Sequence, residues 1–193
     1  TAVQNPLSSL EADVQAIQRV LDRQNGPTLL VGHSWAGVPI TQAGLHNNVA
    51  GVVYLSAIVP DNNEAAAEAL QRNNAPMEGL EPDANGEIVL PFDVFKQVMG
   101  NDLSGLRNEL LTAVQVPMNA RAFGDKIEQA AWRKKPSFYL LTEKDNALPF
   151  EVQKRFAEQI KAETKTLATG HLSMIAQPNT IANWLSEIAK KLD

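Results

Sequence analysis

Short apolar runs that alternate with helical patterns constrain the fold of this chain most strongly. Residues 28–31 and 49–55 are apolar and rich in branched side chains. Neither run shows the polar alternation typical of a strand with one solvated face. A strand that is apolar on both sides must be covered on both faces, as in the parallel sheet of an α/β protein. The sequence therefore predicts a mainly parallel sheet flanked by helices.

Helical patterns separate and follow these runs. Apolar residues recur at helical intervals in the first segment, at Leu10, Val14, Ile17 and Leu21. Ser8 and Glu11 have the spacing of a capping box, which predicts the start of this helix, and we expect the helix to end before the Asn25-Gly26-Pro27 turn. The other predicted core elements are helices over residues 35–46, 150–161 and 181–192 and strands over residues 138–142 and 164–168.

Residues 61–135 interrupt this alternation. No long apolar strand occurs there, and short amphipathic pieces separated by Gly, Pro and Asn predict a helical insertion, which would form a lid over the carboxyl ends of the strands. Residues 83–90 are expected to form a small hairpin or loop. We therefore divide the chain into core residues 1–60, a helical cap insertion of residues 61–135 and core residues 136–193. The short helices are expected over residues 65–72, 92–99, 103–114 and 127–132.

The composition excludes several classes of function. The 17 Lys and Arg residues against 22 Asp and Glu leave a net charge of -5, so the chain has no basic footprint for nucleic acid or for an acidic membrane surface. With no cysteine and only three histidines, we expect neither a metal site nor a cofactor. No apolar run is long enough to span a bilayer. We expect a soluble protein, cytoplasmic by default, whose partner is a small molecule.

The turn between the first strand and its helix contains a serine. It reads Gly32-His33-Ser34-Trp35-Ala36-Gly37. A sharp strand-to-helix turn raises a serine Oγ above the sheet edge and leaves the next amide free to donate to an oxyanion. Such turns need small residues two positions from the serine, and we expect Ala36, one methyl larger than glycine, to be tolerated. The alternative is a tight turn without catalytic chemistry, as in nucleotide-binding or sugar-binding α/β domains.

A nucleophilic serine needs a histidine as general base. His33 adjoins the serine, so its side chain is expected on the opposite face, in a packing or turn-supporting role. His46 lies near the end of the following helix and is expected at the surface. His171 follows the last strand, in a loop from which it can reach over the sheet edge, and we predict that it is the base.

An acid must hold the other ring nitrogen of that histidine. Asp145 follows the strand at residues 138–142 and is the predicted acid, with a turn or helix-capping role before Pro149 as the alternative. Asp61, which follows the strand ending near Ile58 and Val59, is the alternative acid, and Glu143 is a weaker candidate.

The order Ser34, Asp145, His171 resembles that of the α/β-hydrolase superfamily, in particular its small esterase-like members whose turn reads GHSxGG. The resemblance covers essentially the whole chain through the segments GPTLLVGHSWAG, VVYLSAIVP, PSFYLLTEKDNALP and TGHLSMIAQP. It implies a nucleophile at Ser34, an acid at Asp145, a base at His171 and the Trp35 amide as one oxyanion donor.

The resemblance also implies a strand and a His-Gly loop before the part that this chain matches. That loop supplies a second oxyanion donor in the superfamily, and no residue here can be assigned to it. We therefore expect this N-terminal βα portion to be absent from the chain, either removed or held as a separate segment of the same protein, and Thr1 to Asn5 to be the tail of its closing strand. Losing one oxyanion donor lowers turnover by about 100- to 1,000-fold.

Apolar residues of the cap are candidates for a substrate pocket or for the cap's own core. They are Met77, Leu80, Phe92, Phe95, Met99, Met118 and Phe123, and Trp35 is the best candidate for a pocket wall. No arginine cluster for a carboxylate is evident, so the sequence favours a serine hydrolase that cleaves small or medium uncharged carboxylic esters through an acyl-enzyme. The alternatives are a non-catalytic ligand-binding or signalling homologue and a C–C or hydroxynitrile lyase that uses the same three residues.

Overall fold

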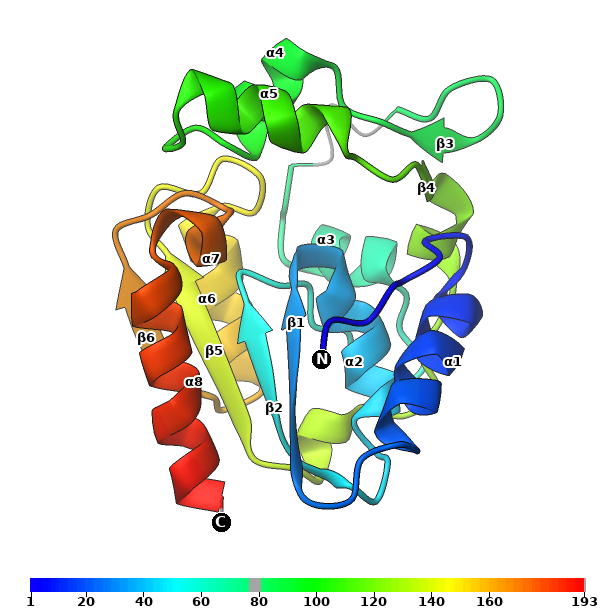
Figure 1. Cartoon of the computed structure of the whole chain (residues 1–193). Coiled ribbons are helices and arrows are strands. Elements are labelled where there is room, and N and C mark those ends of the chain that lie inside the picture. Colours follow the sequence, from blue (N-terminus) through cyan, green and yellow to red (C-terminus); the bar gives the residue numbers. More distant parts are fainter. Residues whose placement is uncertain (77–80, 193) are drawn as a thin grey trace.

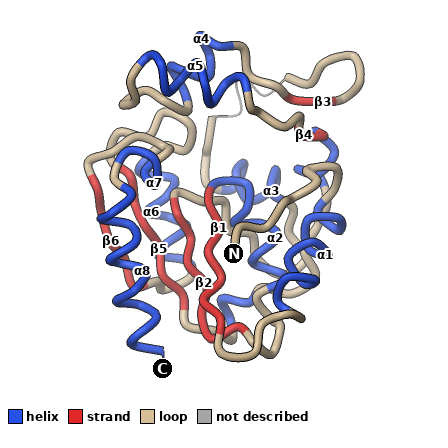
Figure 2. Tube along the Cα trace, viewed as in Figure 1, coloured by secondary structure: helices blue, strands red, loops and turns tan. Residues whose placement is uncertain are grey.

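The computed structural model describes residues 1–76 and 81–192, and its centre is a parallel four-stranded sheet. Figure 1 shows the sheet with helices on both sides, and Figure 2 shows the strands next to one another. The strand order is β1-β2-β5-β6, with bounds β1 Thr28–His33, β2 Val49–Leu55, β5 Ser137–Thr142 and β6 Glu163–Leu167. The predicted parallel α/β sheet is confirmed.

Both faces of β2 are buried, as its continuous apolar run predicts. Val52 and Tyr54 belong to the core cluster that includes side chains of α1 (Leu10–Leu21), α2 (Gly37–Ala43) and α6 (Phe150–Gln159). Val53 and Leu55 point the other way, into the cluster with α8 (Pro178–Leu192). Successive side chains of a strand alternate between its faces, so a strand between two helical layers needs apolar residues at every position. This packing fixes the strand ends, from which the site is built.

Helix α1 begins one residue later than predicted. Ser9, not Ser8, is the N-cap, and its side chain accepts a hydrogen bond from the Ala12 amide at 3.2 Å. The reason is that Leu7 adopts a left-handed conformation (φ 56°), and its amide donates to the carboxylate of Asp13 at 2.8 Å. The left-handed angle and this hydrogen bond lead into an extended Ser9 at the helix start, the conformation that an N-cap requires.

The N-terminal residues are not a strand, contrary to the expectation for Thr1 to Asn5. The chain runs from there towards α1 without pairing with the sheet (Figure 1). Its main-chain hydrogen bonds go elsewhere: Leu7 accepts from the Asn119 amide at 2.9 Å, and Ser8 accepts from the Arg121 side chain at 3.2 Å. Partners from the inserted segment therefore determine its path.

The inserted segment divides into two parts. Helix α3 (Ala66–Arg72) packs into the core cluster through Ala66, Ala69 and Leu70, and Ile127 is fully buried in the same cluster. Helices α4 (Phe92–Val98) and α5 (Gly105–Ala113), with β3 (Glu87–Ile88) and β4 (Met118–Asn119), lie beyond the carboxyl ends of the strands (Figure 1). We call residues 81–119 the outer cap.

Several predicted elements differ from the structure in this region. Residues 127–132 are not a helix: only Ala131–Arg133 form a 3-10 turn, because the buried Ile127 is held by a hydrogen bond from its amide to the Glu64 carbonyl. Residues 83–90 form the predicted loop, closed by a hydrogen bond from the Asp83 amide to the Glu87 carbonyl at 2.8 Å, and β3 within it pairs with the distant β4. A short helix α7 (Ser173–Ala176) was not predicted, and α8 begins at Pro178, earlier than expected.

Within residues 1–76 and 81–192, no helix combines the length and the apolar character needed to cross a membrane.

Candidate active site

Ser34 lies at the carboxyl end of β1 in a strained conformation. Its φ is 53°, in the left-handed region that costs a non-glycine residue about 1–2 kcal/mol. The turn is crowded: a Cβ on Gly32 would lie 2.7 Å from the Ala36 carbonyl oxygen, and one on Gly37 would collide with the Ile58 carbonyl. Ala36 has ordinary helical angles (φ -60°, ψ -14°), which explains why a methyl group is accommodated there.

Trp35 follows the serine and is buried. Its amide lies in the first turn of the helical segment, where backbone N–H groups have no partner within the helix. Its indole Nε1 donates to Asp13 Oδ2 at 2.8 Å, and its ring packs against Phe123 with centroids 5.2 Å apart. The indole is therefore fixed by α1 on one side and by Phe123 on the other.

Asp145 and His171 meet at the carboxyl ends of the strands. Asp145 follows β5 and His171 follows β6, and Asp145 Oδ2 lies 2.8 Å from His171 Nδ1, with both side chains buried. A carboxylate accepts only, so Nδ1 carries the proton and a neutral imidazole then has Nε2 as an acceptor. Nε2 is buried and has no hydrogen-bond partner among the described residues. His171 and Ser34 line the same cavity but are not hydrogen-bonded to each other in this structure.

The Asp145 carboxylate is held by further hydrogen bonds. Its donors, besides His171, are the Ala147 and Leu148 amides (each 2.8 Å), Thr142 Oγ1 (2.8 Å) and Gln153 Nε2 (3.0 Å). Burial raises the pKa of Asp145, but the hydrogen bond and charge of His171, with the Leu148 and Thr142 donors, outweigh burial and leave the pKa below its ordinary value. The group is therefore ionised near neutral pH.

His33 does not line the cavity that Ser34 and His171 share, and its contacts fit the predicted packing or turn-supporting role. Its Nε2 lies 2.9 Å from the His171 carbonyl oxygen, and the two imidazole rings are 4.5 Å apart. Burial, and next the charge of His171, lower the pKa of His33 to about 3. His33 is therefore neutral and donates its Nε2 proton to the carbonyl.

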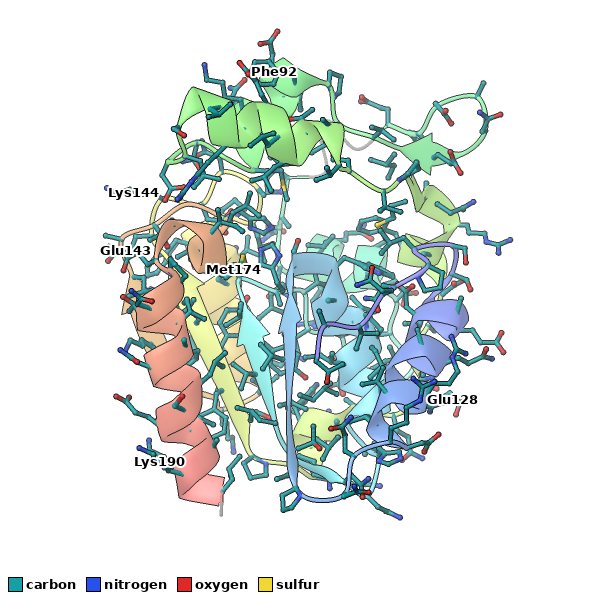
Figure 3. All side chains as sticks on the ribbon, in the orientation of Figure 1. Phe92, Glu128, Glu143, Lys144, Met174 and Lys190 are labelled. Carbon is teal, nitrogen blue, oxygen red and sulfur yellow. The ribbon has the colours of Figure 1, made fainter. Side chains whose placement is uncertain are left out.

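The other candidates lie away from His171. Asp61 forms a two-pronged pair with Arg133, whose hydrogen bond is the main reason that the pKa of Asp61 is lowered. Glu143 is exposed, at the edge of the molecule in Figure 3. His46 pairs with Asp22 at 3.1 Å, near the surface as expected. Of the three candidate acids, only Asp145 contacts His171.

A cavity of about 300 Å³ lies between the sheet edge and the outer cap. Ser34, His171 and Asn146 supply its polar groups, and no Asp, Glu, Lys or Arg of the described residues lines it. The predicted candidates Trp35, Met99 and Phe123 line it, with Ile58, Leu70, Leu90, Val94 and Val98 among the other apolar residues. The cavity therefore favours an uncharged, apolar group next to Ser34.

Three predicted pocket residues do not line this cavity. Phe95 is buried on α4. Phe92 lies at the top of the molecule in Figure 3, and Met118 packs against the core cluster from β4. Met77 and Leu80 lie outside the described residues. A helical pattern identifies apolar positions, but which of them faces a cavity depends on how the short helices are oriented.

A second hollow, of about 380 Å³, lies beside β1. It is lined by the N-terminal residues, α1 and β1, and it contains none of Ser34, Asp145 and His171. Within the described ranges, no group of three or more His, Asp or Glu side chains is placed to hold a metal ion.

Sequence reasoning missed two buried polar residues near the site, Asp13 and Gln153. Each has a signal in the sequence. Asp13 lies three residues after Leu10 and four before Ile17, and so falls on the apolar face of its helix. Gln153 is three residues before Phe156, on the buried face of α6. A polar residue on an apolar helix face indicates a buried partner.

The parallel sheet, with Ser34 on a strained strand-to-helix turn and an acid–histidine pair on later loops, defines a hydrolase of the α/β class. The chain belongs to the alpha/beta hydrolase family, whose model matches residues 4–184.

Individual relatives agree with this family. A probable hydrolase from a Phoma species is 26% identical over 199 residues, covering 95% of this chain and 80% of that protein. The crystal structure of polyneuridine aldehyde esterase has a TM-score of 0.79 at 18% identity, over 96% of this chain and 81% of the other. A pyrethroid hydrolase from Sphingobium faniae has a TM-score of 0.77 at 18% identity, over 94% and 78%. At these identities, the two solved structures establish the fold alone.

Proposed function

We propose that this protein hydrolyses small to medium, uncharged carboxylic esters, with Ser34 as nucleophile, His171 as general base and Asp145 as the acid that orients it. One observation carries the proposal: the buried Asp145–His171 pair leaves His171 Nε2 without a hydrogen-bond partner among the described residues, and His171 and Ser34 line the same cavity. The names of two similar proteins, an esterase and a pyrethroid hydrolase, support the same class of reaction.

Each side chain has a defined part in the proposed reaction. Ser34 Oγ attacks the ester carbonyl carbon while His171 Nε2 takes its proton, and the Trp35 amide donates to the oxyanion. The tetrahedral intermediate collapses as the proton passes from Nε2 to the leaving alcohol, which gives an acyl-enzyme and free alcohol. Water then attacks the acyl group with His171 again as base, releasing the carboxylic acid and restoring Ser34. Asp145 holds the imidazole orientation and stabilises its positive charge.

Kinetics with p-nitrophenyl butyrate test this function. We expect the wild-type chain to hydrolyse the ester and Ser34→Ala to lose at least about 1,000-fold in kcat, because a triad without its nucleophile retains only background catalysis. The matched control is Ser186→Ala on the exposed surface of α8, which should retain wild-type kcat. Unchanged hydrolysis in Ser34→Ala would exclude the proposed nucleophile.

A fluorophosphonate probe separates the proposed function from its alternatives. An activated Ser34 should become labelled, with the adduct located by peptide mass spectrometry, and His171→Ala should abolish labelling. Binding of a small ester without labelling or turnover would indicate a ligand-binding homologue. Release of an aldehyde and cyanide from a cyanohydrin, without ester hydrolysis, would indicate a lyase.

A further inference from the structure

One turn of the outer cap contacts both loops that carry the acid and the base. Asp102 Oδ2 accepts a hydrogen bond from the Gly170 amide at 2.6 Å, directly before His171. The neighbouring Asn101 donates from Nδ2 to the Lys144 carbonyl at 2.8 Å, directly before Asp145. Two adjacent residues of the turn between α4 and α5 therefore contact the main chain directly before Asp145 and directly before His171.

This turn is held in shape from within the cap. Asn108 on α5 is fully buried, and its Nδ2 lies within hydrogen-bond distance of three carbonyl oxygens of the turn, those of Gly100 (2.9 Å), Leu103 (3.3 Å) and Ser104 (3.2 Å). A buried side chain with several main-chain partners rigidifies the backbone that it contacts. Asn101 and Asp102 are thus presented from a defined backbone.

The approach between the turn and the base loop is close. A Cβ on Gly170 would lie 2.3 Å from Asn101 Oδ1 and 2.8 Å from Asp102 Oδ1, so any larger residue there would displace these two side chains. A further hydrogen bond connects the outer cap to the acid loop, since Asn146 Nδ2, directly after Asp145, donates to the Gln97 carbonyl on α4 at 2.9 Å. Figure 3 labels Lys144 on the acid loop, below the cap helices.

The acid and base loops are also bonded to each other. The Lys144 amide donates to the Thr169 carbonyl at 3.0 Å, two residues before His171. Displacing one loop therefore displaces the other, and the 2.8 Å bond between Asp145 and His171 depends on their relative position.

We propose that Asn101 and Asp102 are positioning residues, which hold the acid and base loops together as one unit. The alignment of His171 with Asp145 then depends on how the outer cap packs against these two loops. Neither residue lines the cavity, so both act through the loops rather than on substrate. The kinetic consequence rests on the proposed ester hydrolysis, whereas the structural consequence for the two loops does not.

Hydrogen–deuterium exchange of the whole chain tests the structural part. In Asp102→Ala we expect faster exchange in the peptides covering residues 168–173 and also 143–148, although Asp102 contacts only the first. Asn101→Ala should accelerate exchange in the same two segments from the other side. Faster exchange only in the loop that each residue contacts directly would overturn the proposal.

Kinetics test the catalytic part with p-nitrophenyl acetate, whose acyl group is too small to depend on the cavity walls. Asp102→Ala should lower kcat about tenfold with KM within twofold of wild type, because a small misplacement of reacting groups costs rate rather than binding. Asp102→Asn keeps a side-chain oxygen that accepts from Gly170 and should recover most of kcat. A change confined to KM would show that the turn merely tethers the cap.

A matched control removes the same charge elsewhere on the cap. Glu109→Ala on α5 loses an exposed carboxylate, and we expect wild-type kcat and exchange in both loops. Thermal unfolding of every variant checks that the fold is intact. A wild-type chain without ester hydrolysis would remove the proposed function but leave the exchange experiment decisive for the two loops.

Discussion

Single polar residues in apolar surroundings decide how the site is held. Asp13 is fully buried and has two donors, the Leu7 amide and the Trp35 indole, each at 2.8 Å. An acceptor with two buried donors is costly to remove, because both donors then lose their partner. This one carboxylate connects the start of α1 to the residue beside Ser34.

Asp13→Ala should therefore destabilise the protein and loosen the cavity wall. We expect a loss of about 2–4 kcal/mol in the free energy of unfolding, from two unsatisfied donors at roughly 1–3 kcal/mol each with partial relaxation. Urea unfolding followed by tryptophan fluorescence measures the change. The control is Glu11→Gln, an exposed carboxylate on the same helix, which should change stability by less than about 0.5 kcal/mol. Equal stability of Asp13→Ala and wild type would refute this role.

His33 should contribute to loss of stability in acid. Its pKa is about 3 in the folded protein against an ordinary value of 6.5, because burial disfavours its charged form. Between these values the unfolded chain binds more protons, so the free energy of unfolding falls as the pH drops below 6.5. One such proton gives at most about 1.4 kcal/mol per pH unit. Because the residue as a whole is only half-buried, solvent screening reduces this contribution, and we expect about 0.5–1 kcal/mol per pH unit.

The measurement is urea unfolding between pH 4 and 7 for wild type and His33→Gln. Glutamine keeps a donor for the His171 carbonyl but does not titrate, so its slope with pH should be smaller. The lowered pKa of Asp145 also removes stability in acid, but in both proteins, and it cancels in the comparison. His46→Gln removes a histidine that pairs with Asp22 and leaves the contribution of His33 in place. Identical slopes for His33→Gln and wild type would contradict the assignment.

The chemistry-bearing residues were easier to predict than the residues that hold them. Asp145 and His171 were predicted as a pair because the carboxyl ends of parallel strands meet at one edge, and the structure places them in contact. The contact between His33 and the His171 carbonyl could not be predicted, since the two residues lie 138 positions apart in the sequence. Asn101 and Asp102 lie in a cap turn far along the chain from both loops, and no local pattern encodes such contacts.

At the level of elements, the strand-to-helix turn at Ser34 limits the size of the side chains that can flank the serine. The two positions that flank the serine at equal distance are not equivalent. Gly32 faces the Ala36 carbonyl and the Ile40 side chain, whereas Ala36 already carries a methyl group without strain. The small-residue rule therefore applies strictly on the strand side and loosely on the helix side.

Gly32→Ala should damage the turn, and Ala36→Gly should not. A Cβ at position 32 lies 2.7 Å from backbone and 2.8 Å from Ile40 Cδ1, so the backbone must move. We expect a loss of about 1–3 kcal/mol in the free energy of unfolding, as for overpacked cores, and at least tenfold slower fluorophosphonate labelling. Ala36→Gly should cost about 0.5–1 kcal/mol and label at the wild-type rate. Labelling of Gly32→Ala at the wild-type rate would show that the turn adjusts freely.

At the level of the whole molecule, the core was predictable and the arrangement of the insertion was not. The apolar runs of β1, β2 and β5 specify strands covered on both faces, and that requirement leaves few architectures. The short helices α3, α4 and α5 have no comparable constraint in their sequences. Which of them packs into the core, as α3 does, and which stands over the cavity depends on contacts between distant segments.

The cavity between core and outer cap should set an optimum for acyl length. Apolar side chains from both layers line it, and each methylene buried in such a cavity contributes about 0.8 kcal/mol, or roughly fourfold in kcat/KM. We expect kcat/KM for p-nitrophenyl esters to rise with chain length until the acyl group reaches the far wall and then to fall. Esters with a charged acyl group should be poor substrates, because no charged side chain of the described residues lines the cavity.

A filled cavity should move this optimum without affecting the chemistry. Val98→Phe on α4 adds volume inside the cavity, so the optimum should shift to shorter acyl chains, while kcat for the acetate ester stays within about twofold. Val114→Phe makes the same substitution at a residue that is 70% exposed, on the outer side of the cap, and should leave the profile unchanged. If both variants kept the wild-type optimum, this cavity would not be the site that determines the preferred acyl length. If both variants shifted the optimum equally, the shift would come from a general disturbance of the cap and not from the lost cavity volume.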